Sequence, residues 1–389
     1  MSPAGDAVLT GVTHWSRDLG PYVWHRFDRD RVQHDLQAIA DAGVQTVRTL
    51  LPWDVFMPAI THPDDGALRN LETVLALSEA VGLRVVPVLF AQTLGDCVFL
   101  PHYAIDVDAA RPGVRAVTDG VVQPGGPRDQ YTDSRMIEAE LRWLEAVLTA
   151  FAGNPVIAMW DLGHDPASVM RPRRIEQLRA WAAMLAGPVH DAGERCAVTL
   201  GVADITTARG VRLEAVASAV DALGLAVDAE SLSFATPAPS AAAVTFVAQL
   251  ALRLAAGDTP LHCHLSADHA TDVEPEAIAG VQRFAGDSVD RLVDAGCAGI
   301  HAGAWSECSE RVYALAPFDR RPDLARRGLV DTAGTPTAFG AAWLRGAANA
   351  GSAQPPQPWP ESLDVADYYA NLPHSIDDLF AEWARVAGD

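Results

Sequence analysis

The chain repeats one pattern, in which an amphipathic stretch ends in a glycine and a short apolar run follows at once. In the stretches, apolar residues recur at helical spacing, as in Val32, Leu36 and Ile39. A glycine just past a helix end adopts the left-handed conformation without the steric penalty that a Cβ imposes. The pattern therefore predicts helices that stop at these glycines and strands that begin after them. The glycines concerned are Gly43, Gly82, Gly153, Gly193, Gly257 and Gly296.

The apolar runs carry few polar residues, as expected for parallel strands whose two faces are both covered. Strands are predicted at 8–14, 44–51, 83–90, 156–162, 196–202, 222–227, 261–265 and 297–305. Helices are predicted at 28–42, 66–81, 133–152, 171–192, 208–218, 238–256, 274–294 and 336–347. Eight strands alternating with eight helices are typical of the closed (β/α)₈ TIM barrel of the α/β class. A doubly wound open sheet is the alternative, but the Gly-rich turn that normally follows its first strand is missing.

Two segments are longer or more polar than ordinary barrel loops. Residues 92–132 are rich in Pro, Gly and Asp and follow the third predicted strand, so they are expected to shape the carboxyl-end mouth. Residues 349–362 form a Pro-rich linker. We therefore predict a barrel domain over 1–348 and a short C-terminal helical extension over 363–389 that packs back on the barrel.

Composition narrows the classes of partner. Hydrophobic residues make up 49% of the 389 residues, which is ample for a core, and the formal net charge is −21. An acidic surface repels nucleic-acid phosphates and anionic lipid, so neither nucleic acid nor membrane is an expected partner. The five cysteines form no C-x-x-C pair, so neither a zinc ribbon nor a disulfide framework is suggested, and the favoured interpretation includes no cofactor or metal. The first residues lack the pattern of a secretory signal, so a cytoplasmic location is expected.

Several stretches resemble a known enzyme family. They are GVTHW and HRFDRDRVQHDLQAIADAGVQTVRTLLPWDVFMP near the start, LRVVPVLFAQTLGDCVFLP, NPVIAMWDLGHDP, and PFDRRPDLARRGLVDTAGTPTAF. Together they resemble family 5 glycoside hydrolases of clan A, most closely the β-mannosidase- and cellulase-like branches. The similarity extends over about residues 8–346. The resemblance implies a carbohydrate ligand, with a β-linked sugar or oligosaccharide expected.

The resemblance also implies two catalytic carboxylates, an acid at the end of strand four and a nucleophile at the end of strand seven. At strand four the family's Asn-Glu is replaced by His164-Asp165, where Asp165 is either a shortened acid or a cap for the segment after Pro166. At strand seven Leu265 or His264 stands where the nucleophilic Glu belongs, and we assign Leu265 to that position. The aromatic residue expected at strand six is also missing.

Other positions of the family's sugar site have counterparts here. Arg48 matches an arginine that binds the nucleophile, or else pairs with a barrel acid such as Asp161. Trp305 matches the aromatic floor of the central sugar subsite. The remaining residues expected to line the same pocket are His14, Trp53, His102 and His164.

Three functional hypotheses follow. The favoured one is a barrel that has lost retaining hydrolysis and binds sugar or a partner. The second is an active O-glycosyl hydrolase with Asp165 as acid and Asp268, Glu230 or Glu307 as second carboxylate. The third is a metal-dependent hydrolase built on the strand-seven histidines, unless His262 and His264 face the helix layer instead. Its conceivable ligands are His164, Asp165, His262, Cys263, His264, Asp268, His269 and His301.

Overall fold

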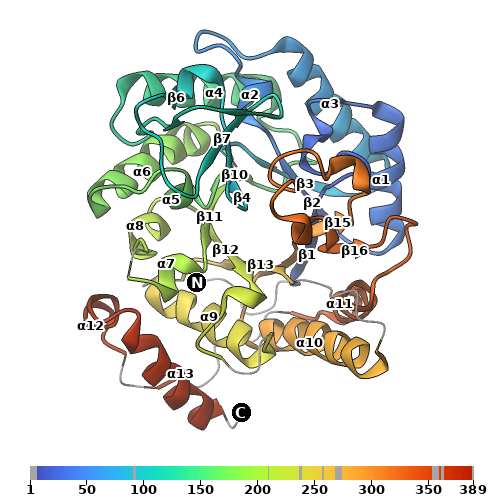
Figure 1. The fold of residues 1–389 in the computed structure, drawn as a ribbon, viewed down its shortest axis with the longest axis vertical. Helices are drawn as coiled ribbons and strands as arrows, with labels where there is room; N and C mark the ends of the chain where they lie inside the picture. The colour runs from blue at the N-terminus through green and yellow to red at the C-terminus, as the bar shows by residue number, and fades with distance from the viewer. Residues whose placement is uncertain are drawn as a thin grey trace.

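Eight parallel strands close into a barrel in the computed structural model, as the hydrophobic pattern predicts (Figure 1). Each strand pairs with the next along the chain, and the last pairs with the first. The strands are β1 (Leu9–Thr13), β2 (Thr46–Leu50), β3 (Arg84–Val88), β10 (Trp160–His164), β11 (Cys196–Gly201), β12 (Ala222–Asp228), β13 (Leu261–Ser266) and β14 (Gly299–Ala302). The structure describes residues 7–90, 93–208, 210–235, 239–255, 258–267, 274–352, 359–360 and 363–387.

Each predicted helical range contains or overlaps a helix in the structure. The helices are α1 (Arg29–Asp41), α3 (Asp65–Ala80), α4 (Ser134–Phe151), α6 (Ile175–Asp191), α8 (Glu214–Ala217), α9 (Ala241–Leu254), α10 (Pro275–Asp294) and α11 (Ala338–Asn349). The carboxylates of Asp28, Asp64 and Asp133 accept hydrogen bonds from first-turn N–H groups, which fixes where α1, α3 and α4 begin. Five of the glycines that mark helix ends have φ between 75° and 91°, as predicted, whereas Gly257 lies outside the described residues.

Strand four begins later than predicted. Residues 156–162 were expected to form it, but the regular strand β10 covers Trp160–His164. Ile157 makes only an isolated bridge to Val85, and the pairing with β11 shifts register between Asp161 and His164. This irregularity carries the strand to His164, directly before Asp165.

Polar side chains fill the barrel interior because small residues make room for them. A Cβ on Gly11 would overlap the His301 ring, and one on Gly299 would overlap the His262 ring. The alternate residues Cys263 and Leu265 of β13 are fully buried in the main hydrophobic core. Since side chains alternate along a strand, β13 directs its histidines inward and its apolar residues to the helix layer.

Two further segments cover the barrel. The insertion after β3 forms a small sheet from β4 (Thr93–Leu94), β5 (Cys97–Phe99), β7 (Arg115–Thr118) and β8 (Val121–Gln123). Near the C-terminus, α12 (Val365–Ala370) precedes α13 (His374–Ala387), which packs on α9 (Figure 1). There, Trp383 Nε1 donates to Gln249 Oε1 at 2.7 Å. Within the described ranges, no helix combines the length and apolar character needed to cross a bilayer.

Candidate functional site

A pocket of about 350 Å³ opens at the carboxyl ends of the barrel strands, where TIM-barrel sites are built. Residues at or just beyond the ends of seven barrel strands contribute to its wall. The polar and aromatic members of that wall are Thr13, Trp15, Arg48, Thr93, His164, Asp165, Ser168, Asp228, Ser231, His264, Ser266, Arg321 and Arg327. The volume lies within the range of small-molecule sites.

Arg48 of β2 anchors the floor of this pocket through a buried ion pair. Its Nε and Nη2 atoms donate to Asp161 Oδ2 at 3.2 and 2.5 Å, and Thr199 Oγ1 donates to the same oxygen at 2.7 Å. Both charged side chains are only 3% exposed. The pairing of Arg48 with a barrel acid is therefore confirmed. Arg48 Nη2 also lies 3.3 Å from His164 Nδ1, which brings the end of β10 into the same network.

Asp165 lies one residue beyond β10 and lines the pocket. Its backbone is left-handed, with φ 51° and ψ 56°, an uncommon conformation for a residue with a side chain. The turn aims the carboxyl group over Gly201 of β11, where a Cβ would meet it at 3.1 Å. Ser168 Oγ donates to Asp165 Oδ2 at 2.6 Å. Burial raises the pKa of Asp165, and the hydrogen bonds from Ser168 only partly oppose that rise.

Asp204, which the sequence did not single out, is a second buried carboxyl group near Asp165. It is buried in the short helix α7 (Ala203–Thr206) after β11, and it accepts hydrogen bonds from the backbone N–H groups of Gly201 and Val211 at 3.2 and 3.1 Å. Burial and then the nearby charge of Asp165 raise the pKa of Asp204 to about 7. Two carboxyl groups with raised pKa values therefore lie together on the β10–β11 side of the mouth.

The neighbouring strands β13 and β14 contribute histidines that point into the barrel. His262 Nδ1 lies 3.2 Å from His301 Nε2, and the His264 ring stacks on His301 with 4.6 Å between centroids. Their inward direction rules out the alternative in which His262 and His264 face the helix layer. Burial lowers the pKa of His262 to about 4 and the pKa of His164 to about 3, and Arg48 adds to the second shift. These rings are neutral at ordinary pH.

Among the described residues, the strand-seven histidines do not gather with the proposed ligands into a metal centre. Cys263 faces the helix layer, away from His262 and His264. Asp268 and His269 lie outside the described residues. Over the part of the chain that the structure describes, no third ligand atom joins these rings closely enough to share an ion.

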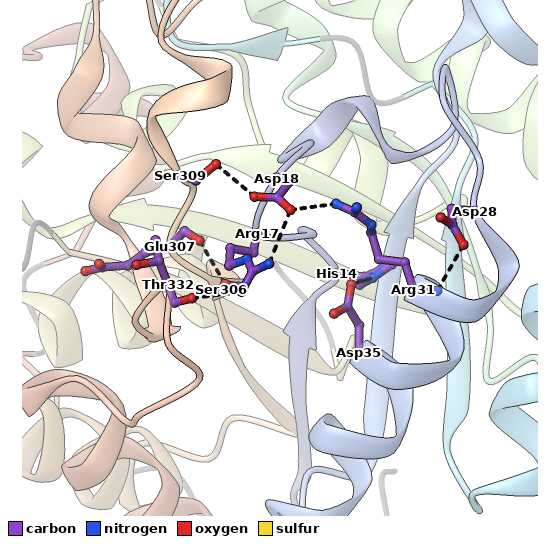
Figure 2. Close-up of polar contacts among 10 residues, drawn as sticks. All are labelled: His14, Arg17, Asp18, Asp28, Arg31, Asp35, Ser306, Glu307, Ser309 and Thr332. Atoms are coloured by element: carbon purple, nitrogen blue, oxygen red, sulfur yellow. Dashed lines mark hydrogen bonds and ion pairs between the residues drawn. The ribbon is translucent and has the colours of Figure 1, made fainter.

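The structure places several predicted site residues outside the pocket. Leu265 is fully buried towards the helices, so the mouth-facing residues of β13 are His264 and Ser266, and Leu265 does not fit the nucleophile position. His14 turns towards α1, where its Nε2 lies 3.1 Å from Asp35 Oδ2 (Figure 2). Trp53 and Trp305 are buried in the core, and neither lines the pocket.

His102 lies on the surface of the insertion, exposed and also outside the pocket wall. Of the predicted set, Arg48, His164 and Asp165 do come together at the mouth. Of the candidate second carboxylates, Glu230 and Glu307 do not line the pocket.

The pocket instead takes its aromatic wall from Trp15 and its second carboxylate from Asp228. Trp15 packs edge-on against Phe318, with 5.9 Å between ring centroids. Asp228 ends β12 and accepts a hydrogen bond from Arg327 Nη1 at 2.9 Å. Burial acts to raise the pKa of Asp228, but the hydrogen bond with Glu230 and the charge of Arg327 outweigh burial and lower it.

No family model matches the chain, and no curated protein is similar to it in sequence. Solved structures are similar in fold. GH5_18 from Streptomyces cattleya, in complex with GlcNAc, is 18% identical, covers 99% of this chain and 92% of its own, and has a TM-score of 0.79. GH5_18 from Bifidobacterium longum subsp. infantis is 16% identical, covers 98% and 90%, and has a TM-score of 0.78.

The exo-beta-1,4-mannosidase Op5Man5 from Opitutaceae bacterium strain TAV5 is 16% identical, with a TM-score of 0.72. The match covers 89% of this chain, which spans only 60% of that protein. At such identities the similarity establishes the fold alone. The chain therefore has the clan-A barrel fold of family 5 glycoside hydrolases, as its sequence motifs imply.

Proposed function

We propose that the barrel mouth binds a β-linked sugar and that the protein has lost retaining hydrolysis. The observation that carries this proposal is the pair of mouth-facing residues on β13, His264 and Ser266. A retaining glycosidase needs a carboxylate there, about 5–5.5 Å from its acid, to attack the anomeric carbon. Among the described residues, β13 offers only an imidazole and a hydroxyl at the mouth, and neither is a carboxylate.

The rest of the pocket suits a sugar ligand. Trp15 offers part of an indole ring, on which the apolar face of a sugar can pack. Asp165, Asp228, Arg321 and Arg327 supply hydrogen-bonding groups around it. A variant of the Streptomyces cattleya GH5_18 protein was solved in complex with Manb1-4GlcNAc, which makes this disaccharide the first ligand to test.

The test combines binding and turnover on the full chain. Titration calorimetry with Manb1-4GlcNAc is expected to show one site, weakened at least tenfold by Trp15→Phe and by Asp228→Asn. Tyr313→Ala, which removes an exposed aromatic ring outside the pocket, serves as the control and should bind normally. A panel of aryl β-glycosides should show no retaining turnover. Absence of binding to every sugar tested, or a trapped glycosyl-enzyme adduct, would refute the proposal.

One observation favours a second function, hydrolysis with inversion. The environments of Asp165 and Asp228 push their pKa values in opposite directions, as an acid and a base require. Asp165 directly follows β10 and Asp228 ends β12; these strands flank β11, so they lie roughly 10 Å apart. Inverting carboxylates stand about 6.5–9.5 Å apart. The ion pair with Arg327 weakens Asp228 as a base, which is why sugar binding without hydrolysis remains our main proposal.

The two functions are separated by the anomer of any product. Inversion predicts that the α-anomer is released first from a β-glycoside, as followed by NMR. Asp165→Asn and Asp228→Asn should each abolish that turnover while both proteins stay folded. Turnover that survives either substitution would exclude this pair of residues.

A further inference from the structure

A group of three side chains that could bind one metal ion lies at the opposite, amino-terminal end of the barrel. His190 is in the last turn of α6, Cys196 is the first residue of β11, and Asp221 directly precedes β12. The register pairs Ala197 with Ala222, so the residues before them, Cys196 and Asp221, also lie side by side. The helix end places His190 over both.

The three ligand atoms lie close enough together for a small tetrahedral ion to bridge them. His190 Nε2 lies 3.1 Å from Asp221 Oδ2 and 3.6 Å from Cys196 Sγ, and all three atoms lie within 4.8 Å of one another. Zinc binds sulfur at about 2.3 Å and nitrogen or oxygen at about 2.0–2.2 Å, so tetrahedral ligands stand roughly 3.3–3.6 Å apart. The two distances from His190 Nε2 need little adjustment to match.

The surroundings hold the ligands in place and leave one side open. The Cys196 backbone N–H donates to Asp221 Oδ2 at 2.8 Å and so orients the carboxylate. Cys196 is buried, whereas the side chains of His190 and Asp221 are 43% and 35% exposed. A water molecule can therefore reach the fourth coordination position from solvent.

We propose that His190, Cys196 and Asp221 bind one Zn²⁺ ion, with water as the fourth ligand. The combination of a thiol, an imidazole and a carboxylate favours zinc over magnesium or calcium, which prefer oxygen ligands alone. Binding replaces the thiol proton, which passes to solvent, and forms the Zn–S bond. The ion ties the end of α6 to the starts of β11 and β12, so its role is to stabilise the barrel base. This proposal does not depend on the function of the mouth.

The experiment uses the full chain after treatment with a chelator and dialysis. Calorimetric titration with ZnCl₂ is expected to give one ion per chain. Titration with CoCl₂ should produce a thiolate-to-cobalt charge-transfer band in the near ultraviolet and intense visible bands of a tetrahedral ion. Cys196→Ser should remove the charge-transfer band, and His190→Gln and Asp221→Asn should each weaken Zn²⁺ binding at least tenfold.

Matched controls make the result decisive. Asp191→Asn removes an exposed carboxylate adjacent to His190, and His102→Gln removes an exposed imidazole elsewhere; both should bind Zn²⁺ normally. The proposal is overturned if folded protein gives no charge-transfer band, or if Asp191→Asn weakens binding as much as Asp221→Asn. If Cys196→Ser fails to fold, the exposed variant His190→Gln replaces it, and Zn²⁺ affinity equal to that of the wild type overturns the proposal.

Discussion

The two ends of strand β11 present different arrangements of the same residue types. At the Gly201 end, histidines are buried among other histidines and Arg48, and the carboxyl groups of Asp165 and Asp204 lie close to each other. At the Cys196 end, a half-exposed histidine faces a carboxylate and a thiol directly. At the mouth, groups of like chemistry thus lie beside the ion pairs Arg48–Asp161 and Arg327–Asp228, whereas at the base one histidine, one carboxylate and one thiol face each other.

This difference shows that the ability of a histidine to bind a metal ion depends on the side chains that its ring faces, and not on the number of histidines nearby. Several histidines lie around β13, where, in the described part of the chain, the rings of His262 and His264 contact His301. In barrels of this kind the mouth carries function and the base carries stability. A ligand pocket at the mouth and the proposed stabilising Zn²⁺ site at the base fit that division.

The largest effect is expected at the buried ion pair of the mouth. Arg48→Met leaves Asp161 charged and uncompensated in the barrel, which should lower the free energy of unfolding by about 3–5 kcal/mol. Urea denaturation monitored by circular dichroism measures it. The double variant Arg48→Met/Asp161→Leu should recover most of the loss. If Arg48→Met is as stable as the wild type, the ion pair with Asp161 does not stabilise the mouth end of the barrel.

The next largest effect is a pH dependence from Asp204. Its pKa rises from 3.8 in a free side chain to about 7 in the folded protein. A raised carboxyl pKa contributes stability that is full below about pH 4 and is lost as the pH rises through 7. The shift corresponds to at most about 4 kcal/mol. Asp204→Asn should remove this part of the slope between pH 4 and 8.

The origin of the Asp204 shift can be tested further. Because the charge of Asp165 contributes to it, Asp165→Asn should move the loss of stability to lower pH. Unfolding curves for the wild type and both variants across this pH range are the measurement. Identical slopes in all three proteins would contradict the coupling of the two carboxyl groups.

His262 should produce a smaller dependence of the opposite sign. Burial lowers its pKa from 6.5 to about 4, so the unfolded chain binds a proton at pH values where the folded protein does not. The stability it contributes is full above pH 6.5 and falls as the pH drops towards 4. From pH 7 to 5 the loss is about 2 kcal/mol for this residue. His262→Asn should be less sensitive to acid than the wild type, and an unchanged acid response would exclude a neutral buried ring.

The fold was predictable from local pattern, because glycine after each amphipathic stretch marks a helix end wherever the stretch lies. The site was predictable only in part, because alternation along a strand turns an error of one residue into the wrong face. Leu265 was chosen where His264 and Ser266 face the mouth. Similarly, Trp305 is buried beside the pocket-lining Ala304, and the aromatic wall comes from Trp15.

The cluster at the base had no local signal at all. Cys196 and Asp221 are 25 residues apart in the chain, and only the pairing of β11 with β12 brings them together. Asp204 was missed for a related reason, since its importance comes from burial beside Asp165 rather than from any motif. Contacts that depend on register require the folded structure.

The smallest expected effect is that of metal removal on sugar affinity, and it tests most directly whether the two ends are independent. Cys196 and Gly201 stand five residues apart on β11, so the base and the mouth are roughly 17 Å from each other. Removing metal with a chelator should therefore lower the melting temperature and leave the affinity for a mouth-bound sugar unchanged within error. Titration calorimetry with Manb1-4GlcNAc before and after chelation measures the sugar affinity, and differential scanning calorimetry measures the melting temperature.

Loss of sugar affinity on chelation, restored by Zn²⁺, would instead favour a metal ion at the mouth, as a metal-dependent hydrolase requires. The same loss seen in Cys196→Ser without chelator would show that the two ends are coupled.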